Sequence, residues 1–375
     1  MSRKVIGGPT GTGRDPNAKL LRVVDIKTHF RTEKGTVRAV DGVSFTLDRG
    51  RTLGVVGESG SGKTILSRSI MGLLPKRNVV RQGHVYYEGT DIIGLPDEEM
   101  RHVWGSEMAM VFQDPMTSLN PVKKIGKQIT ESLFLHLHMD KQDAHDTALA
   151  LLSSVGIPEP EQRLNEYPHQ LSGGMRQRVV IAIALACGPK LLFADEPTTA
   201  LDVTVQAQIL NLLQQLQRER HMAMILVTHD LGVVAGRTDE IAVMYAGKVV
   251  EHAPTPVLFS NMKMPYTEAL LSSIPKLDYP SHTRLEVIPG RPPDLINPPR
   301  GCRFAPRCKY AQERCLNEEP PLIAAETPGH MFRCWFPVGS PEGEEALSRN
   351  LAAGASASGV PVTDVPMPAS LAGRS

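Results

Sequence analysis

Apolar residues are grouped in two ways along most of the chain. Short, mostly apolar runs occur at 51–57, 191–195, 223–230 and 240–251, and such runs are typical of strands buried on both faces of a sheet. The stretches between them, such as 203–220, repeat apolar residues at the spacing of a helix. Strands that alternate with helices predict an α/β domain built on a largely parallel sheet.

Residues from about 96 to 180 interrupt this alternation. They contain amphipathic, helix-like stretches at 124–137 and 143–156, and the pattern indicates no convincing strand among them. We therefore expect a helical subdomain of about 96–180 to be inserted into the α/β domain, which we place at 20–255.

The segments outside the α/β domain have a different composition. Residues 1–19 and 341–375 are rich in glycine, proline and small polar residues, and we expect a disordered leader and a disordered tail. Between 256 and 340 proline is dense, which predicts a separate, irregular C-terminal module.

Charge and composition limit the classes of function. The chain has 375 residues and a formal charge of +1, because 41 Lys and Arg are balanced by 40 Asp and Glu. A chain so balanced is not built to neutralise many phosphates, and we expect no nucleic-acid partner. No apolar run approaches the roughly 18–20 residues that span a bilayer, and residues 1–17 lack the apolar core of a signal peptide. We expect a cytosolic protein, a setting in which clustered cysteines bind metal more often than they form disulfides.

A phosphate-binding loop follows the first of the buried strands. Its sequence, GESGSGKT, fits the pattern G-x-x-x-x-G-K-[ST], with a strand before it and a helix after it. The glycines let backbone N–H groups face phosphate oxygens at the helix start, Lys63 reaches the β- and γ-phosphates, and the Thr64 hydroxyl binds Mg²⁺. The alternative is a glycine-rich turn that matches by chance. The predicted nucleotide-binding residues of the loop are Gly57, Glu58, Ser59, Gly60, Ser61, Gly62, Lys63 and Thr64.

A pair of carboxylates supplies the metal site and the base that such a loop requires. Asp195 ends the apolar run 191–195, and Glu196 follows it directly. We predict that Asp195 holds Mg²⁺ through water and that Glu196 polarises the attacking water. An acidic pair after a strand is by itself often a helix-capping turn, and only its occurrence with the phosphate loop favours catalysis.

A second anion site is predicted at the start of another helix. Ser172, Gly173 and Gly174 precede a long apolar helix, whose first N–H groups and dipole favour an anion. One nucleotide does not need two glycine-rich sites from one chain, so we expect this site to bind the γ-phosphate of a nucleotide held by a second subunit.

Two further polar residues follow predicted strands. Gln113 could reach Mg²⁺ or the attacking water, and His229 could contact the γ-phosphate. A glutamine or a histidine in such a position is, taken alone, more often structural.

Six motifs occur in an order that resembles one family. GESGSGKT, FQDP, LSGGMRQR, LLFADE, TALD and VTHD follow the order seen in the ATPase subunits of ABC transporters, over residues 20–255. The resemblance implies a P-loop ABC ATPase with a RecA-like core, a β-subdomain and a helical subdomain, and it implies ATP and Mg²⁺. It assigns Gln113 to the Q-loop, Asp202 to the D-loop and His229 to the switch histidine. Phe30 takes roughly the place of the aromatic residue that stacks on adenine, the alternative being a core aromatic.

One position departs from the family's pattern. The signature commonly reads LSGGQ, and Met175 takes the last position here. The serine and both glycines that bind phosphate are present, as is Glu196, so we expect an intact site and competent ATP hydrolysis.

Three classes of ABC protein compete. They are a subunit that docks on separate membrane proteins, a soluble protein that acts on DNA or ribosomes, and an exporter half with its own membrane domain. The lack of a spanning segment argues against the exporter half. Soluble ABC proteins usually have two cassettes, a coiled-coil insertion or basic linkers, and the sequence has none of these. We favour the transporter subunit and keep the non-transport ATPase as the alternative.

The C-terminal part narrows the family. Residues 264–336 resemble the C-terminal extension of ATPases from oligopeptide/dipeptide-type ABC importers. Most such proteins have His before PYT, where this chain has Met264, and we expect this departure to affect no proposed ligand. The resemblance implies import of di- or oligopeptides, with nickel, glutathione, an opine or an oligosaccharide as the alternative solute. It also implies a second homologous ATPase subunit, two transmembrane permease subunits and a solute-binding protein, with this chain at the cytoplasmic face of the cell membrane.

Four of the five cysteines, Cys302, Cys308, Cys315 and Cys334, lie in the proline-rich module. A small module with little apolar core often needs a metal to hold it together. Four thiolates suit tetrahedral Zn²⁺ or a [4Fe–4S] cluster, and free or disulfide-linked thiols are a third possibility. Structural zinc sites usually pair cysteines about two to four residues apart, a spacing missing here. The longer, uneven gaps fit a cluster better, and the resemblance to an extension reported to hold one favours [4Fe–4S], with zinc as the alternative.

Overall fold

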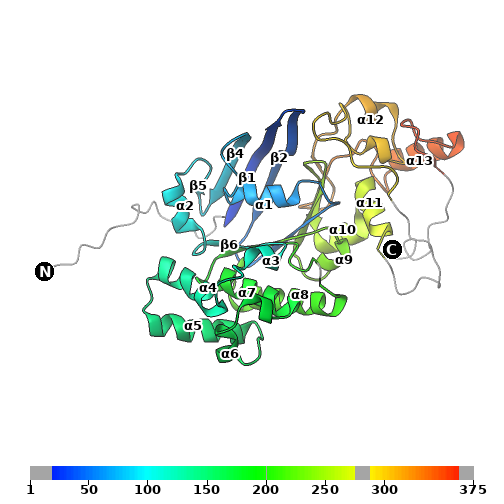
Figure 1. Ribbon diagram of the computed structural model, residues 1–375. Coiled ribbons are helices and arrows are strands. Elements are labelled where there is room, and N and C mark those ends of the chain that lie inside the picture. The colour runs from blue at the N-terminus through cyan, green and yellow to red at the C-terminus, as the bar shows by residue number, and fades with distance from the viewer. Residues whose placement is uncertain (1–18, 200, 275–287, 363–375) are drawn as a thin grey trace.

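The computed structural model describes residues 19–199, 201–274 and 288–362, and Figure 1 shows their arrangement. Two β-sheets form the centre of the molecule, and helices cover the faces of the larger sheet. The predicted leader at 1–19 lies outside the described residues except for Lys19, and so does the last part of the predicted tail.

The larger sheet has eight strands in the order β11-β12-β10-β9-β3-β8-β7-β6. Pairing is parallel from β9 through β3, β8 and β7 to β6, and antiparallel from β9 to β10, β12 and β11. Parallel strands end at the same edge, so the loops after β3, β6, β7 and β8 meet there. The strands are β3 (Thr52–Val56), β6 (Met108–Val111), β7 (Leu191–Asp195), β8 (Ala223–Thr228), β9 (Glu240–Tyr245), β10 (Lys248–Pro254), β11 (Ile323–Ala324) and β12 (Met331–Phe332).

The central strands are buried on both faces, as their apolar runs predict. In β7, Leu191 and Phe193 pack into one core, whereas Leu192 and Ala194 pack into the other. This alternation follows from the two-residue period of a strand. The sheet therefore separates two apolar cores, and the mixed α/β architecture confirms the predicted class of fold.

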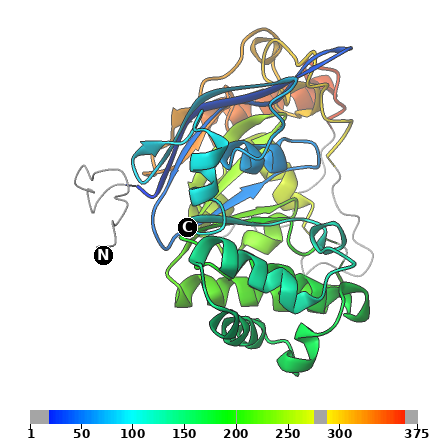
Figure 2. The ribbon, with the colours of Figure 1, turned by 60° about the vertical axis from the view of Figure 1, so that its left-hand side comes forward.

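A smaller antiparallel sheet, β2-β1-β4-β5, lies above α1 (Lys63–Ile70), and together they cover one face of the large sheet. Figure 2 shows its long strands as a separate layer at the top of the molecule. The strands are β1 (Leu21–Thr32), β2 (Gly35–Leu47), β4 (Val79–Tyr87) and β5 (Thr90–Asp91).

Helices gather at the opposite end of the molecule (Figures 1 and 2). The predicted helical stretch of about 96–180 is mostly helical, but it also contains β6, the short strand predicted before Gln113. Four residues are too few to show a period, and β6 is fixed by its parallel pairing with β7. Residues 96–185 form α2 (Asp97–Val103), α3 (Pro115–Ser118), α4 (Ile125–Ser132), the π-helix η1 (Leu133–Leu137), α5 (Lys141–Ser154), α6 (Pro160–Leu164), the 3-10 turn η2 (Pro168–Gln170) and α7 (Gly173–Leu185). Two further helices, α8 (Val203–Glu219) and α9 (Leu231–Val234), follow later in the chain.

The C-terminal module is attached to the large sheet. Its strand β12 pairs with β10, and β11 pairs with β12, so the module extends the sheet at one edge. The rest of the described C-terminal part consists of short helices joined by irregular segments. These are α10 (Thr255–Asn261), α11 (Pro265–Ser272), the 3-10 turn η3 (Ala305–Arg307), α12 (Glu313–Asn317) and α13 (Pro341–Ala353).

Helix α13 corrects the prediction of a disordered tail from residue 341. Ser340 caps the helix by accepting a hydrogen bond from the Gly343 N–H, and Gly354 ends it in the left-handed conformation. The Asn350 side chain joins the helix to the module by donating to the Lys309 carbonyl at 2.8 Å. The caps and the contacts of Asn350 stabilise the helix in a segment whose composition alone indicates disorder.

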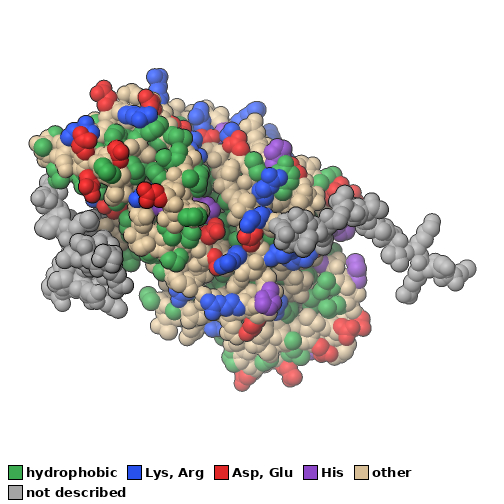
Figure 3. Space-filling view, turned by 180° about the vertical axis from the view of Figure 1, so that it is seen from behind, with side chains coloured by type: hydrophobic (Ala, Val, Ile, Leu, Met, Phe, Trp, Pro, Cys, Tyr) green, Lys and Arg blue, Asp and Glu red, His purple; other side chains and the backbone are tan. Residues whose placement is uncertain are grey.

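On the face shown in Figure 3, acidic and basic side chains are interspersed. Among the described residues, no helix has both the length and the apolar character needed to cross a bilayer.

Candidate nucleotide-binding site

The phosphate-binding loop connects the end of β3 to the start of α1, as the sequence predicts. Gly62, the residue before the helix, has a φ of 103°, and a Cβ there would lie 2.1 Å from the carbonyl oxygen of Ala39. Only glycine fits this position, because both the dihedral angle and the close approach exclude a side chain. The loop is thereby fixed against β2 with its N–H groups at the start of α1.

The side chain of Lys63 is buried against the phosphate-binding loop. Its ammonium donates to the carbonyl oxygens of Gly57 at 2.7 Å and Glu58 at 3.1 Å, and it lies 3.8 Å from Oε1 of Glu196. Burial lowers the pKa of Lys63, while the charges of Glu196, Asp195 and Glu58 oppose that change. The cation is therefore held at the mouth of the loop, where a phosphate would meet it.

Thr64 and Asp195 are joined across the sheet edge. The Thr64 hydroxyl donates to Oδ1 of Asp195 at 2.9 Å. The Asp195 carboxylate is fully buried, and its Oδ2 has no hydrogen-bond partner within the described part of the chain. Burial raises the pKa of Asp195, although the hydrogen bond from Thr64 opposes this. A buried carboxylate oxygen without a partner, beside a hydroxyl, fits the oxygen ligands that Mg²⁺ prefers.

Two of the predicted residues, Gln113 and His229, converge on Glu196. Its Oε2 accepts hydrogen bonds from Gln113 Nε2 and Thr199 Oγ1, both at 3.1 Å, and lies 3.4 Å from Nδ1 of His229. Glu196 itself has a φ of 45°, an uncommon conformation for a residue with a side chain. The structure therefore brings Gln113, Glu196 and His229 together, from three different loops. The sequence analysis does not predict a role for Thr199. This residue begins the TALD motif, in which only Asp202 is assigned a role.

The predicted second anion site lies at the start of α7. Ser172 caps the helix by accepting a hydrogen bond from the Met175 N–H at 3.3 Å, and its side chain is exposed. Gly174 approaches Val205 of α8, and the side chain of Asp202 caps α8 by accepting from the Val205 N–H at 2.9 Å. In the described part of the chain, the hydrogen bonds of Ser172 and Asp202 stay within their own helix starts.

Phe30 lies on β1, in register with Val37 of β2 and Val79 of β4. Its ring is partly exposed. No hydrogen bond or ring contact found among the described residues joins it to the phosphate-binding loop, so its stacking on adenine stays a prediction.

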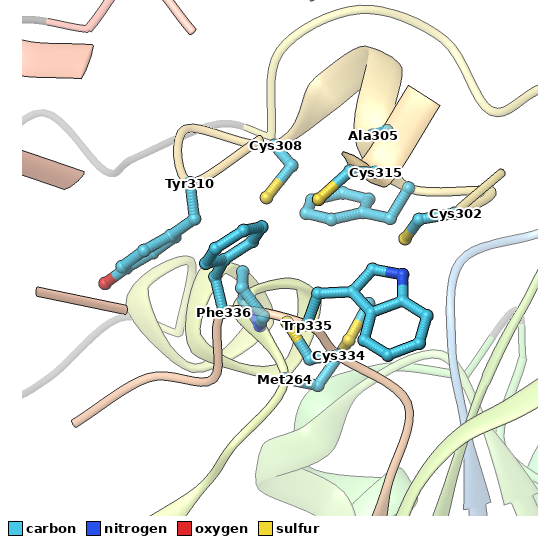
Figure 4. A pocket seen from close by; sticks show the side chains of 11 residues that line it. Met264, Cys302, Ala305, Cys308, Tyr310, Cys315, Cys334, Trp335 and Phe336 are labelled. Atoms are coloured by element: carbon cyan, nitrogen blue, oxygen red, sulfur yellow. The ribbon is translucent and has the colours of Figure 1, made fainter. Parts of the chain in front are cut away.

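The four clustered cysteines line one small pocket, as Figure 4 shows. None of them forms a disulfide. Burial raises the pKa of Cys308 and Cys334 well above the ordinary value and that of Cys302 to about 11, and neighbouring thiols add to each increase. Burial also raises the pKa of Cys315. Without a counter-charge these thiols are held in the neutral form.

Met264 lies in the wall of the same pocket, together with Trp335 and Phe336 (Figure 4). This corrects the expectation that the substitution at Met264 affects no proposed ligand, because the sequence does not show that α11 begins beside the cysteines. Among the described residues, no group of three or more His, Cys, Asp or Glu side chains is placed so that it could hold a metal ion.

The fold and the converging loops define an ATP-binding cassette of the ABC type, which takes ATP and Mg²⁺. Residues 40–199 match the family model of ABC transporters, and residues 250–315 match that of the oligopeptide/dipeptide transporter C-terminal region. The chain belongs to the family of ATP-binding proteins of oligopeptide and dipeptide ABC transporters, whose members are ATP hydrolases.

Individual relatives are similar over almost their whole length. The oligopeptide transport ATP-binding protein OppD of Bacillus subtilis is 50% identical over 341 residues, which cover 89% of this chain and 95% of the relative. The dipeptide transport ATP-binding protein DppD of Lactococcus lactis is 49% identical over 319 residues, covering 85% of this chain and 91% of the relative. Among solved structures, the dimeric ATP-binding cassette MJ0796 bound to ADP and phosphate is 27% identical and gives a TM-score of 0.57. That match covers 63% of this chain and 98% of the cassette.

Proposed function

We propose that this chain hydrolyses ATP to energise the import of di- and oligopeptides through a multi-subunit ABC transporter. The observation that carries the proposal is the convergence of Gln113, Thr199 and His229 on the Glu196 carboxylate, beside a complete phosphate-binding loop. The peptide substrate is supported by the similarity to peptide transport proteins, which extends through both the cassette and the C-terminal region. Other solutes and a non-transport ATPase have no such support.

In the proposed reaction, residues 57–64 bind the phosphates through backbone N–H groups and the Lys63 ammonium. Thr64 and Asp195 would hold Mg²⁺, directly or through water, and the ion would neutralise phosphate charge. Glu196 accepts a proton from the attacking water, whose oxygen bonds to the γ-phosphorus. The bond from that phosphorus to the bridging oxygen breaks, which leaves ADP and phosphate.

The residues around Glu196 position it in this proposal. Gln113 and Thr199 donate to one carboxylate oxygen, so both hold the base in a single orientation. His229 is exposed beside the same oxygen, where its ring is free to contact a γ-phosphate. Phe30 would stack on adenine.

The signature residues serve a second nucleotide. Ser172, Gly173 and Gly174 lie at an exposed helix start and make no hydrogen bond to the loop of their own chain in its described part. We propose that they bind the γ-phosphate on a homologous ATPase subunit, while Asp202 lies at the same interface. The dimeric state of the similar cassette supports this arrangement.

Two permease subunits and a solute-binding protein complete the proposed assembly, with this chain at the cytoplasmic face of the membrane. Support comes from a set of large apolar side chains between residues 112 and 137 that stay exposed. They are Phe112, Met116, Val122, Phe134, Leu135 and Leu137. A permease segment that packs on these side chains would sense any movement of Gln113.

We further propose that residues 256–340 form a C-terminal extension that packs on the cassette at 20–255, and that its cysteines hold a [4Fe–4S] cluster. Cys302, Cys308, Cys315 and Cys334 point into one pocket, and cationic iron would stabilise thiolates that burial disfavours. Zinc stays the alternative, because four thiolates also suit tetrahedral Zn²⁺.

Reconstitution tests the function. The chain, its partner ATPase and the permeases are placed in vesicles with ATP enclosed inside, the binding protein is added outside, and uptake of labelled di- and oligopeptides is measured. We expect uptake that requires ATP and is lost in Lys63→Ala, since that variant lacks the phosphate-binding ammonium. ATP-dependent uptake of nickel or an oligosaccharide, with none of peptides, would overturn the substrate assignment.

A further inference from the structure

Glu58, the second residue of the phosphate-binding loop, is held at all three of its polar groups. Its N–H donates to the Tyr266 hydroxyl at 2.8 Å, and its carbonyl oxygen accepts from Lys63 at 3.1 Å. Its carboxylate accepts two hydrogen bonds from Arg307, at 2.6 Å and 2.9 Å. Two of these three partners belong to the C-terminal part of the chain and not to the cassette.

Arg307 is a buried residue of the cysteine module. It ends the 3-10 turn η3, directly before Cys308, and only 4% of its surface is exposed. Its remaining donors are also used, since Nε donates to the Pro289 carbonyl at 2.7 Å and Nη1 to the Tyr245 hydroxyl at 3.3 Å. A guanidinium with this many fixed partners has one available orientation, and that orientation presents a two-pronged contact to Glu58.

Tyr266 is fixed just as firmly. Its ring packs against Tyr245 and Phe304, with centroids 4.6 Å and 5.3 Å away, and Tyr245 and Phe304 meet at 5.2 Å. Tyr245 ends β9, Tyr266 lies on α11 and Phe304 lies between Cys302 and Cys308. The three rings therefore connect the main sheet, α11 and the cysteine module into one rigid support beneath Glu58.

The charge of Glu58 makes this support important. A carboxylate beside a site for a triphosphate repels the ligand, and it also attracts the Lys63 ammonium that the phosphates need. Glu58 is close enough to Lys63 to oppose the lowering of its pKa. The ion pair with Arg307 neutralises Glu58 and turns its carboxylate toward the C-terminal module.

We propose that Arg307 and Tyr266 are positioning residues for ATP binding, which act by holding and neutralising Glu58 of the phosphate-binding loop. The cysteine module is thereby a part of the nucleotide site. This inference rests on the proposed binding of ATP by residues 57–64.

The test is equilibrium binding of ATP to the purified full-length chain. Arg307→Met should weaken binding by about tenfold or more, which corresponds to ~1.4 kcal/mol. Tyr266→Phe keeps the ring packing and removes only the hydroxyl, so it should weaken binding by about two- to tenfold even if Arg307→Met folds poorly. In Arg307→Met combined with Glu58→Gln, much of the affinity should return, because the uncompensated charge is gone.

Arg333→Met is the matched control. Arg333 is a partly buried arginine of the same module. It donates to the carbonyls of Val249 and Pro320, and within the described residues it forms no hydrogen bond or ion pair with Glu58. ATP affinity should be nearly unchanged in this variant. An equal loss in Arg333→Met, or a loss in Arg307→Met that Glu58→Gln does not relieve, would show general damage to the module and overturn the inference.

The variant Lys63→Ala distinguishes a failure of the proposed function from a failure of this inference. If it binds ATP as tightly as the parent chain, the loop is not the ATP site, and both the proposed function and this inference fall. If Lys63→Ala loses ATP while Arg307→Met and Tyr266→Phe keep it, only the inference is overturned.

Discussion

Nε2 of Gln113 lies 3.1 Å from Oε2 of Glu196, so the loop after β6 contacts the candidate base at the end of β7. Gln113 is exposed and directly follows Phe112, one of the exposed apolar side chains. Movement of that surface would reach Glu196 through a single hydrogen bond. The relationship therefore links the proposed permease contact to the timing of hydrolysis.

Replacing the base should separate binding from turnover. In Glu196→Gln the amide keeps the size and the contacts of the side chain but accepts no proton, so ATP binding should persist while hydrolysis slows by about 10² or more. Phosphate release by the assembled transporter measures this. Glu219→Gln, at the end of α8, is the control and should leave the rate unchanged. Hydrolysis by Glu196→Gln at the parent rate would show that another group activates the water.

Replacing the buried carboxylate should stabilise the nucleotide-free protein. A raised pKa means that the native state takes up a proton more readily than the unfolded chain, so the charged form of Asp195 lowers the free energy of unfolding. Asp195→Asn should therefore raise the free energy of unfolding at neutral pH by about 1–3 kcal/mol, and abolish hydrolysis. The gain should shrink as pH falls through the raised pKa. Denaturant unfolding at several pH values measures it.

Asp143→Asn serves as the control for that series, because Asp143 is exposed on the first turn of α5. Its effect on unfolding should be small at every pH, apart from the weak loss of a helix-dipole contact. A destabilised Asp195→Asn at neutral pH would contradict the account of an uncompensated charge.

A block at the start of α7 should act across the subunit interface. Ser172→Arg places a long side chain where the γ-phosphate of the facing nucleotide is expected, so hydrolysis at that composite site should be lost. ATP binding by the isolated variant should stay near the parent value, since Ser172 makes no hydrogen bond to the chain's own loop in its described part. Ser153→Arg, on exposed α5, is the control. Full activity of a strictly monomeric parent chain would rule out the shared site.

The cysteines should reveal their ligand by colour and composition. Anaerobically purified protein is expected to be brown, with about four iron and four sulfide per chain. Cys308→Ser should remove both iron and colour, whereas Cys187→Ser, outside the pocket, should keep them. Stoichiometric zinc without acid-labile sulfide would leave the four ligands in place but exclude the cluster.

The cassette could be predicted well from sequence because its signals are local. The turn at Gly62, the apolar run before Asp195 and the start of α7 each bring their own residue types and spacing. Parallel pairing then brings the loop ends together, so Gln113 and His229 meet at Glu196. The motifs and their order along the chain were therefore enough to predict that these residues share one site.

Contacts between distant segments could not be predicted in the same way. Arg307 and Glu58 are 249 residues apart, and nothing around either one indicates a partner. Helix α13 is equally hidden, because its order depends on Asn350 and on the chain near Lys309. The short strand β12 has no sequence pattern of its own, since it is defined by its pairing with β10.

The pairing of β12 with β10 also prevents β10 from pairing with a strand of another copy of the chain. Glu251 and His252 are matched by Phe332 and Met331, so the backbone of β10 is covered over this stretch. An open strand edge is a template for joining further chains. A chain cut before residue 288 would expose β10 as the rim of the large sheet. Such a truncation should form soluble clusters and then precipitate at concentrations where the full chain stays dispersed.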